Sequence, residues 1–388
     1  MKYFFSVIIL SFLILNCNLS EGSDYKKYAA QKINTKKSLI DSIKYKEEII
    51  RLEALFSRLY ATGEFNGNVL IAKDNDIIYQ KSFGYSIKET KTLLCDSSIF
   101  QLASVSKVIT GVAALKLYEE GKLHLETKVC DILTDFPYKN VTVKHLLTHR
   151  SGLPHYTYFS GKYVRDTVKC VSNQCMLDIM VKHKPMAYAK AGLRFEYSNT
   201  NYALLALIIE KLSGKNYSKF LKEDVFQPLG MKHSYTALDI DSTRAHITHG
   251  YTMKYGWVAN DKYDGIVGDK GIYTSTYDLY LLSTALFNQK FLNQTTLDLA
   301  YSPHSKEVKE SNYGFGWRMR NISDDEKEVF HNGWWHGYRN AYHRRLKDNL
   351  TIIVLSNRLN KSVYNTWLVY DAIDGVKPTL ATNKDTQE

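Results

Sequence analysis

Short segments rich in apolar residues and joined in pairs by polar turn residues lie near both ends of the chain, and they predict β-strands. Helically spaced apolar residues outside these segments predict helices at the two termini. In order, the predicted elements are a helix over 49–59, a hairpin over 67–73 and 77–83, a second hairpin over 342–346 and 350–355, and a closing helix over 362–373. Strands contributed by both ends predict one sheet built from both ends of the chain.

The middle of the chain, over about residues 104–290, is dominated by helical spacing and loops. One helix begins near Ser104 and is expected to stop at Gly121. Another follows Asn199 and is expected to end at Gly214. The predicted fold is therefore α/β, more strictly α+β, with a sheet from about 45–100 and 300–376 and an all-helical region inserted between them.

The charge of the chain suggests partners but identifies none. The 388 residues carry a formal net charge of +11, and the 51 Lys and Arg are scattered. There is no dense basic run and no zinc-ligand or RNA-binding signature. We therefore expect a solvated basic surface and no nucleic-acid partner.

The N-terminus has the pattern of a targeting segment. Lys2 precedes an apolar run over residues 3–15, which is too short to span a membrane, so residues 1–17 are predicted to be a signal peptide. Ile14-Leu15-Asn16-Cys17 resembles the bacterial lipobox, which implies a lipid anchor at Cys17 as the expected membrane contact. Asn16 stands where a small residue is usual, so plain secretion is the alternative.

The segments after the signal peptide complete the predicted organisation. Residues 18–44 are a polar tether leading into the N-terminal helix, residues 45–376 form the main domain, and 377–388 are a polar tail. An exported protein of the bacterial cell envelope, periplasmic or attached to the outer membrane, is expected. Four further cysteines permit two disulfides, with reduced thiols as the alternative: Cys95, Cys130, Cys170 and Cys175.

The strongest chemical signal in the sequence is a hydroxyl and an amine three residues apart, at Ser104 and Lys107. This spacing places both side chains on one helical face, at the positive end of the helix dipole, where the amine can share the hydroxyl proton. The pattern alone is weak, because Ser23 and Lys26 repeat it in a polar stretch.

Two further patterns acquire meaning only in combination. Tyr197 and Asn199 precede a helix, where Asn199 could be merely a helix cap. His331-Asn-Gly333-Trp334 leads into the final hairpin, and its glycine would let a ligand approach the backbone.

His145 and His149 have the spacing of two metal ligands on a helix. The Glu of a zinc-protease helix is missing between them, so structural histidines are the preferred interpretation and no metal site is predicted.

Ser-x-x-Lys, Tyr-x-Asn and His-x-Gly in this order resemble the serine β-lactamase and penicillin-binding protein superfamily, on its class C-like branch, which includes DD-peptidases and esterases. The resemblance covers about residues 67–357. It includes further phrases similar to family landmarks: Gly121-Lys-Leu-His-Leu, His145-Leu-Leu-Thr-His-Arg-Ser-Gly-Leu-Pro154, Pro228-Leu-Gly-Met231, Tyr273-Thr-Ser-Thr-Tyr-Asp278 and Tyr313-Gly-Phe-Gly-Trp317.

The resemblance implies a β-lactamase-like fold, in which an antiparallel sheet is flanked by terminal helices and the active site lies in the cleft between the sheet and an all-helical region. It implies that Ser104 is the nucleophile and that Lys107 and Tyr197 share the proton chemistry, with the identity of the base left open. Asn199 is expected to hold the substrate amide and the Lys107 amine. The backbone amides of Ser104 and Trp334 are expected to form the oxyanion hole, and no cofactor is required.

His331 stands where β-lactamases of this superfamily usually carry the Lys of Lys-Thr-Gly. A neutral imidazole anchors a substrate carboxylate poorly, so this task is weakened or transferred, with Arg339 as a candidate. We expect a serine hydrolase acting on an ester or a D-amino-acid amide, a small molecule or a peptidoglycan derivative. The alternatives are a true class C-type β-lactamase and a non-catalytic peptidoglycan- or β-lactam-binding protein. An α/β-hydrolase is disfavoured because the chain has no Gly-x-Ser-x-Gly.

Overall fold

The computed structural model describes residues 44–164, 171–241, 246–305, 311–323 and 326–376. The predicted signal peptide, Cys17, Cys170 and the polar tail lie outside these ranges, as does the tether apart from its last residue. Within the described ranges Cys95, Cys130 and Cys175 are free thiols. No helix in those ranges is both long and apolar enough to cross a bilayer.

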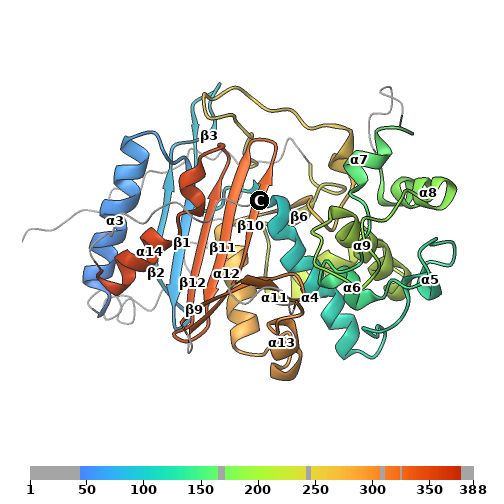
Figure 1. Ribbon diagram of the computed structural model, residues 1–388. Helices are drawn as coiled ribbons and strands as arrows, with labels where there is room; N and C mark the ends of the chain where they lie inside the picture. The colour runs from blue at the N-terminus through green and yellow to red at the C-terminus, as the bar shows by residue number, and fades with distance from the viewer. Residues whose placement is uncertain (1–43, 165–170, 242–245, 306–310, 324–325, 377–388) are drawn as a thin grey trace, which may run out of the picture. The chain divides into compact units, whose positions relative to one another are not determined.

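The described residues form a seven-stranded antiparallel sheet to which both ends of the chain contribute, as predicted (Figure 1). The strand order is β2-β1-β12-β11-β10-β9-β8. The bounds are β1 Gly67–Lys73, β2 Asp76–Phe83, β8 Ser311–Tyr313, β9 Arg318–Ser323, β10 Glu326–Trp335, β11 Tyr338–Arg345 and β12 Leu350–Ser356.

Both predicted hairpins are confirmed. Asp74 and Asn75 join β1 to β2 and have φ angles of 51° and 65°, as a two-residue turn that matches the strand twist requires. Strand β11 begins at Tyr338, four residues before the predicted start at 342. The buried polar side chain of Asn340 interrupts the apolar alternation there, because it donates a hydrogen bond to the Gln101 carbonyl (2.9 Å).

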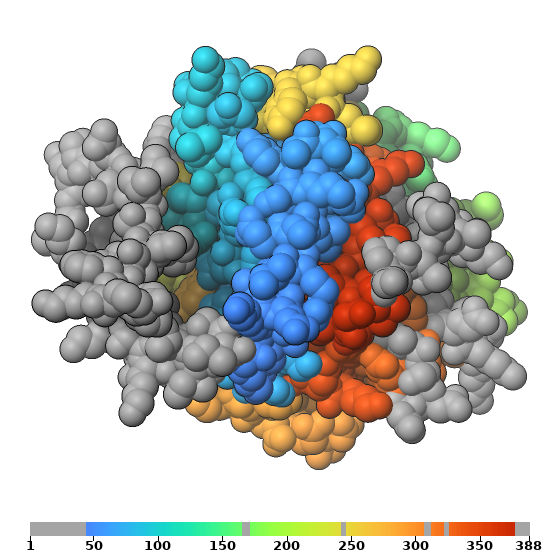
Figure 2. All heavy atoms as spheres, turned by 90° about the vertical axis from the view of Figure 1, so that its left-hand side faces the viewer, coloured from blue at the N-terminus to red at the C-terminus, as the bar shows by residue number. Residues whose placement is uncertain are grey.

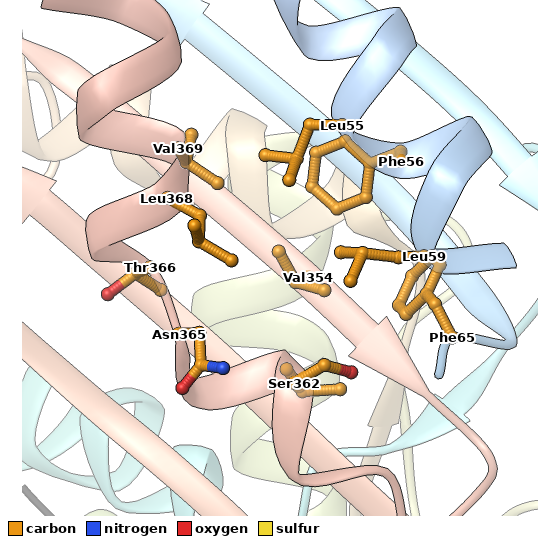
Figure 3. A pocket seen from close by; sticks show the side chains of 11 residues that line it. Leu55, Phe56, Leu59, Phe65, Val354, Ser362, Asn365, Thr366, Leu368 and Val369 are labelled. Carbon is orange, nitrogen blue, oxygen red and sulfur yellow. The ribbon is translucent and has the colours of Figure 1, made fainter. Parts of the chain in front are cut away.

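The sheet is buried on both faces, and successive residues of a strand enter different cores. Val69 and Ile71 of β1 belong to a core formed with α3 (Lys46–Ala61) and α14 (Trp367–Asp374). Figure 2 shows α3 in blue on this side of the molecule beside the red C-terminal segment. A small apolar pocket lies between the two helices over Val354 of β12 (Figure 3). Leu70 and Ala72 belong instead to the larger core shared with the helical part.

The closing helix predicted over 362–373 is wrong as a single element. The chain forms a 3₁₀ turn, η4 (Lys361–Tyr364), and then the separate helix α14. Tertiary hydrogen bonds hold the first turn in place, because the Tyr364 hydroxyl donates to the Gly333 carbonyl (2.8 Å) and the Ser362 hydroxyl donates to the Glu64 carbonyl. The regular apolar spacing did not reveal this break.

Helices dominate the segment between the hairpins, and α4 packs against α9. The bounds of all helices in this segment are η1 Ala103–Val105, α4 Ser106–Glu119, α5 Val129–Ile132, α6 Val143–Leu147, α7 Tyr156–Ser160, α8 Asn173–His183, α9 Asn199–Ser213, α10 Tyr217–Phe220, η2 Leu221–Phe226, α11 Gln227–Leu229, η3 Lys262–Gly265, α12 Thr276–Phe287 and α13 Gln294–Ala300. Helices α4 and α9 are followed by Gly121 and Gly214, both with positive φ, as predicted.

The segment 104–290 is not all-helical. It contains the strands β6 (Tyr235–Thr236) and β7 (Ile272–Thr274), which join β5 (Phe100–Gln101) in a small sheet. A further pair, β3 (Tyr85–Ile87) and β4 (Thr92–Leu93), follows the first hairpin. Helix α12 also falls within this segment but packs on β1 and β12 of the main sheet. Helical spacing in a sequence does not say which partner the apolar face meets.

Candidate active site

A strained turn places Ser104 between the sheet and the helices. Ser104 lies in the 3₁₀ turn η1 immediately before α4, rather than in the first turn of α4 itself. The preceding residue, Ala103, has a φ of 51°, which is uncommon for a residue with a side chain and is typical of functional turns. The two residues beside Ser104 in the turn are buried, whereas Ser104 is half-buried, so its hydroxyl is the side-chain group of this turn that a substrate can reach.

Lys107 lies beside the Ser104 hydroxyl, as the three-residue spacing predicts. Its side chain is fully buried, and its Nζ lies 3.0 Å from Ser104 Oγ and donates to the Asp269 backbone carbonyl (2.7 Å). A neutral amine in this position can donate to the carbonyl and accept the hydroxyl proton. An ammonium can donate to both oxygens. The geometry therefore suits the amine both before and after it takes a proton.

Tyr197 approaches the same oxygen from the start of α9. Its hydroxyl lies 3.1 Å from Ser104 Oγ, and its ring centroid is 5.1 Å from Lys107 Nζ. The Ser104 oxygen thus has two proton-carrying groups within hydrogen-bond distance, which is the reach required of a general base.

His149 fixes the backbone next to Tyr197. Its Nδ1 accepts hydrogen bonds from the Ser198 amide (3.2 Å) and the Asn201 side chain (3.0 Å), and its ring centroid is 4.3 Å from that of Tyr197. Burial, followed by the nearby charge of Lys107, lowers the pKa of His149 well below its usual range. Two donors on Nδ1 also leave no place for a second proton. His149 is therefore a neutral structural histidine that orients the start of α9.

The interpretation of His145 and His149 as structural histidines is supported. The His145 Nδ1 accepts a hydrogen bond from the Thr142 amide (3.1 Å) and completes a capping box at the start of α6.

A different group within the described ranges brings possible metal-ligating atoms within 4.8 Å of one another, at Asp261, Asp264 and His336. There the imidazole pairs with the Asp264 carboxylate (2.9 Å), which also accepts a hydrogen bond from the Trp335 indole (2.7 Å). These contacts join η3 to the turn after β10.

Asn199 does not hold the Lys107 amine, contrary to expectation. Its Oδ1 is buried and has no hydrogen-bond partner among the described residues, because the amine is directed to Ser104 and the Asp269 carbonyl. Asn199 is also the first residue of α9, and the cap position belongs to Ser198. A buried amide oxygen without a donor costs about 1–3 kcal/mol, so this oxygen is suited to accept an N–H from a bound amide.

The end of β10 runs directly against the Ser104 turn. A Cβ placed on Gly333 would lie 2.3 Å from the Leu102 carbonyl oxygen and 3.3 Å from the Ser104 amide nitrogen, so only glycine fits. The next residue, Trp334, pairs with Arg339 on β11 and leaves half of its side chain exposed (51%). The close approach brings the backbone of β10 to the Ser104 amide, where an oxyanion hole would need it.

His331 is a neutral, fully bonded histidine. Its Nδ1 donates to the Asn332 carbonyl (2.6 Å), so its Nε2 accepts from the Tyr313 hydroxyl (3.1 Å). Burial, then the charges of Arg318 and Lys107, lower the pKa of His331 well below its usual range. The expectation that this residue is uncharged at neutral pH is therefore supported.

Arg318, which the sequence reasoning missed, supplies a cation at the site. Its guanidinium lies 5.2 Å from the Tyr197 ring centroid, and it follows Tyr313 and its glycine-rich loop at the start of β9. The sequence candidate Arg339 instead packs over the Tyr364 ring at 5.3 Å. The structure thus brings Arg318 to the tyrosine that contacts Ser104.

The comparisons with known proteins show the family of the chain. A family model described as Beta-lactamase matches residues 52–372, which is most of the chain. The chain belongs to the β-lactamase family. The fold is likewise that of β-lactamases and penicillin-binding proteins, and the chain is a serine hydrolase of this family.

Individual relatives fit the same assignment. Penicillin-binding protein 4* of Bacillus subtilis is 36% identical over 329 residues, covering 81% of this chain and 72% of that protein. Protein flp of Staphylococcus aureus is 28% identical over 308 residues, covering 75% of this chain and 59% of that protein. The crystal structure of a penicillin-binding protein from Bacillus halodurans superposes with a TM-score of 0.71 at 26% identity, covering 83% of this chain and 98% of the other.

Proposed function

We propose that this β-lactamase-family protein hydrolyses an ester or a D-amino-acid amide through an acyl-enzyme on Ser104. The observation that supports the proposal best is that Lys107 Nζ and the Tyr197 hydroxyl both lie within 3.1 Å of Ser104 Oγ. Contacts of both groups with the Ser104 hydroxyl also argue against the alternative of a non-catalytic binding protein.

The proposed reaction needs only groups of this chain and water. Ser104 Oγ attacks the substrate carbonyl while its proton passes to Lys107 or Tyr197, and the amides of Ser104 and Trp334 stabilise the oxyanion. The tetrahedral intermediate then collapses, and the leaving alcohol or amine takes the proton. Water next attacks the acyl-enzyme, again assisted by the base, and regenerates the serine. The unpartnered Oδ1 of Asn199 would accept the N–H of an amide substrate.

The charge of the site favours this substrate class over β-lactams. A neutral His331 cannot replace a lysine as the anchor of a substrate carboxylate, so a neutral ester or amide loses less binding than a cephalosporin does. Arg318 packs over the ring of Tyr197, the residue that contacts Ser104, so its guanidinium is placed to bind a substrate carboxylate. A true class C-type β-lactamase is therefore the second candidate. Cell-wall peptides are a natural source of D-amino-acid amides for an exported enzyme.

The test compares kcat/KM for p-nitrophenyl butyrate, a D-amino-acid p-nitroanilide and a chromogenic cephalosporin. We expect measurable ester or anilide turnover, slow cephalosporin turnover, and a shift toward the cephalosporin in His331→Lys. Cephalosporin hydrolysis near the diffusion limit of about 10⁸ per molar per second, with negligible activity on the other two, would identify a β-lactamase instead.

Arg339 of β11 provides a matched control for the role of Arg318. Arg318→Gln should reduce kcat/KM for the carboxylate-bearing cephalosporin about tenfold or more and leave p-nitrophenyl butyrate nearly unchanged, because only the first substrate carries the anion. Arg339→Gln removes an equal charge that packs over Tyr364. Equal losses in the two variants, or equal losses on both substrates, would show that Arg318 does not select for a carboxylate.

A further inference from the structure

The Cys95 thiol is surrounded by hydrogen-bonding groups outside the active site. It is half-buried between β4 and β5, and its Sγ lies 3.3 Å from His246 Nδ1 and 3.3 Å from Ser97 Oγ. The Ser98 hydroxyl donates to the same sulfur at 3.7 Å. An imidazole and two hydroxyls directed at one sulfur are the surroundings that stabilise a thiolate.

The backbone keeps this pair together. His246 has a φ of 75°, in the left-handed region, and its carbonyl accepts a hydrogen bond from the Ile99 amide (2.8 Å). The Thr248 amide donates to the Ile99 carbonyl (3.0 Å), and the Cys95 amide donates to Ser98 Oγ (2.9 Å). These hydrogen bonds thus hold the segments that carry the thiol and the imidazole next to each other.

The other two described cysteines have different surroundings. The Cys130 thiol donates to the Asp131 carboxylate at 3.7 Å and to the Lys139 carbonyl at 3.9 Å. Burial and the nearby Asp178 raise the pKa of Cys175 above its usual value. These two residues are therefore internal controls for Cys95.

We propose that Cys95 is a modification site, a thiolate paired with the His246 imidazolium that reacts with peroxides and with soft alkylating electrophiles. With a peroxide, the sulfur attacks one oxygen, an S–O bond forms and the O–O bond breaks. The sulfur is oxidised by two electrons to a sulfenic acid. The departing hydroxide takes the imidazolium proton and leaves as water.

The expected selectivity follows from the fraction of thiolate. Burial raises the pKa of Cys95, but the hydrogen bonds with His246, Ser97 and Ser98, together with the charge of His246, outweigh it and lower the pKa to about 7. About half of Cys95 is then thiolate at pH 7, against roughly 1% of a thiol with a pKa near 9. Lower basicity reduces intrinsic nucleophilicity by somewhat less than tenfold over this range, which leaves a net advantage of about fivefold.

Asp96 follows Cys95 directly, but its carboxylate accepts a hydrogen bond from the Ser82 hydroxyl (3.1 Å). The hydrogen bond and charge of the Cys95 sulfur raise the pKa of His246, as a thiolate–imidazolium pair requires. Among the described residues, His246 is thus a charged group within hydrogen-bond distance of the sulfur.

The experiment alkylates the folded full-length chain with limiting iodoacetamide from pH 5 to 9 and measures each cysteine by peptide mapping. We expect Cys95 to react about fivefold faster than Cys130 and Cys175 at pH 7, with a midpoint near pH 7. Similar rates for the three cysteines would overturn the proposal. In a parallel reaction with hydrogen peroxide and dimedone, the dimedone adduct should form on Cys95, and its absence would overturn the oxidation step.

His246→Asn tests whether the imidazole sets the pH midpoint of Cys95 reactivity. Asn is the chosen replacement because it tolerates the left-handed backbone that His246 adopts. This variant should move the Cys95 midpoint above pH 8 and leave Cys130 unchanged. His249→Asn is the matched control, since His249 lies in the same segment and packs against Trp257. An unchanged Cys95 midpoint in His246→Asn would contradict the proposal, and the comparison within the wild-type chain remains decisive if this variant misfolds.

Discussion

Gly333→Ala is the most informative single-methyl change, because it displaces the strand that abuts the nucleophile turn. The added Cβ would lie 2.3 Å from the Leu102 carbonyl oxygen, whereas non-bonded atoms pack at about 3.5 Å. Strand β10 must therefore move by about 1 Å away from Ser104. A displacement of this size at a reacting group costs roughly 100-fold in rate, and overpacking of this kind destabilises the fold by about 1–3 kcal/mol.

The assay is kcat for ester hydrolysis, measured with the thermal midpoint of the same preparation. We expect kcat to fall about 100-fold or more while the variant remains folded. Gly161→Ala is the matched control, because a Cβ there meets its nearest atoms, the Thr157 carbonyl and the Tyr263 hydroxyl, at ordinary distances of 3.8 and 3.9 Å. If Gly333→Ala keeps kcat within threefold of wild type, the close approach of β10 to Ser104 is not needed for catalysis.

Three further predictions follow from the same structure. Tyr197→Phe keeps the ring but removes the hydroxyl 3.1 Å from Ser104 Oγ, so kcat should fall about 100-fold, and unchanged turnover would exclude Tyr197 from proton transfer. Burial keeps His331 neutral in the folded chain, whereas the unfolded chain gains a proton below about pH 6.5, so the free energy of unfolding decreases as pH falls. Measured by urea unfolding between pH 7 and 5, this decrease should be about 2 kcal/mol smaller in His331→Gln than in the wild type, and an equal decrease would contradict this. An alkynyl fatty acid should label the wild type and not Cys17→Ala, and no label on either would favour plain secretion.

The parts of the site that could be predicted from sequence are those set by local geometry. Ser104 and Lys107 meet because three residues along a helical turn bring side chains together, whatever the rest of the fold does. Tyr197 and His331 have no such local relation to Ser104. They could be assigned only through the order of three motifs that resemble a known family.

The missed residues act through contacts between distant segments. The Asp269 backbone carbonyl binds Lys107 from 162 positions away, and a carbonyl leaves no mark in the sequence. Arg318 was indistinguishable from the other scattered cations until β9 brought it over Tyr197. Asn199 was assigned to the Lys107 amine through the family resemblance, whereas the amine bonds to Ser104 Oγ and the Asp269 carbonyl.

The same reason explains the errors in the fold. Both hairpins follow from short apolar runs joined by a short turn, of two residues in the first hairpin and four in the second, which are local signals. The break between η4 and α14 depends on the hydrogen bond from Tyr364 to Gly333, which joins two distant segments. Helix α12 shows regular helical spacing but meets the sheet, a choice decided by packing alone.

The central claim, that Ser104 carries the acyl group, is tested most directly by intact-mass spectrometry and peptide mapping after exposure to a fluorophosphonate or penicillin probe. Two other serines near the site are buried and engaged in hydrogen bonds: Ser106 Oγ accepts a hydrogen bond from the Ile272 amide (3.2 Å), and the Ser151 hydroxyl donates to Asn201. We predict one covalent adduct on the peptide that contains Ser104, and none in Ser104→Ala. An adduct on Ser106 or Ser151, or one that persists in Ser104→Ala, would contradict the account.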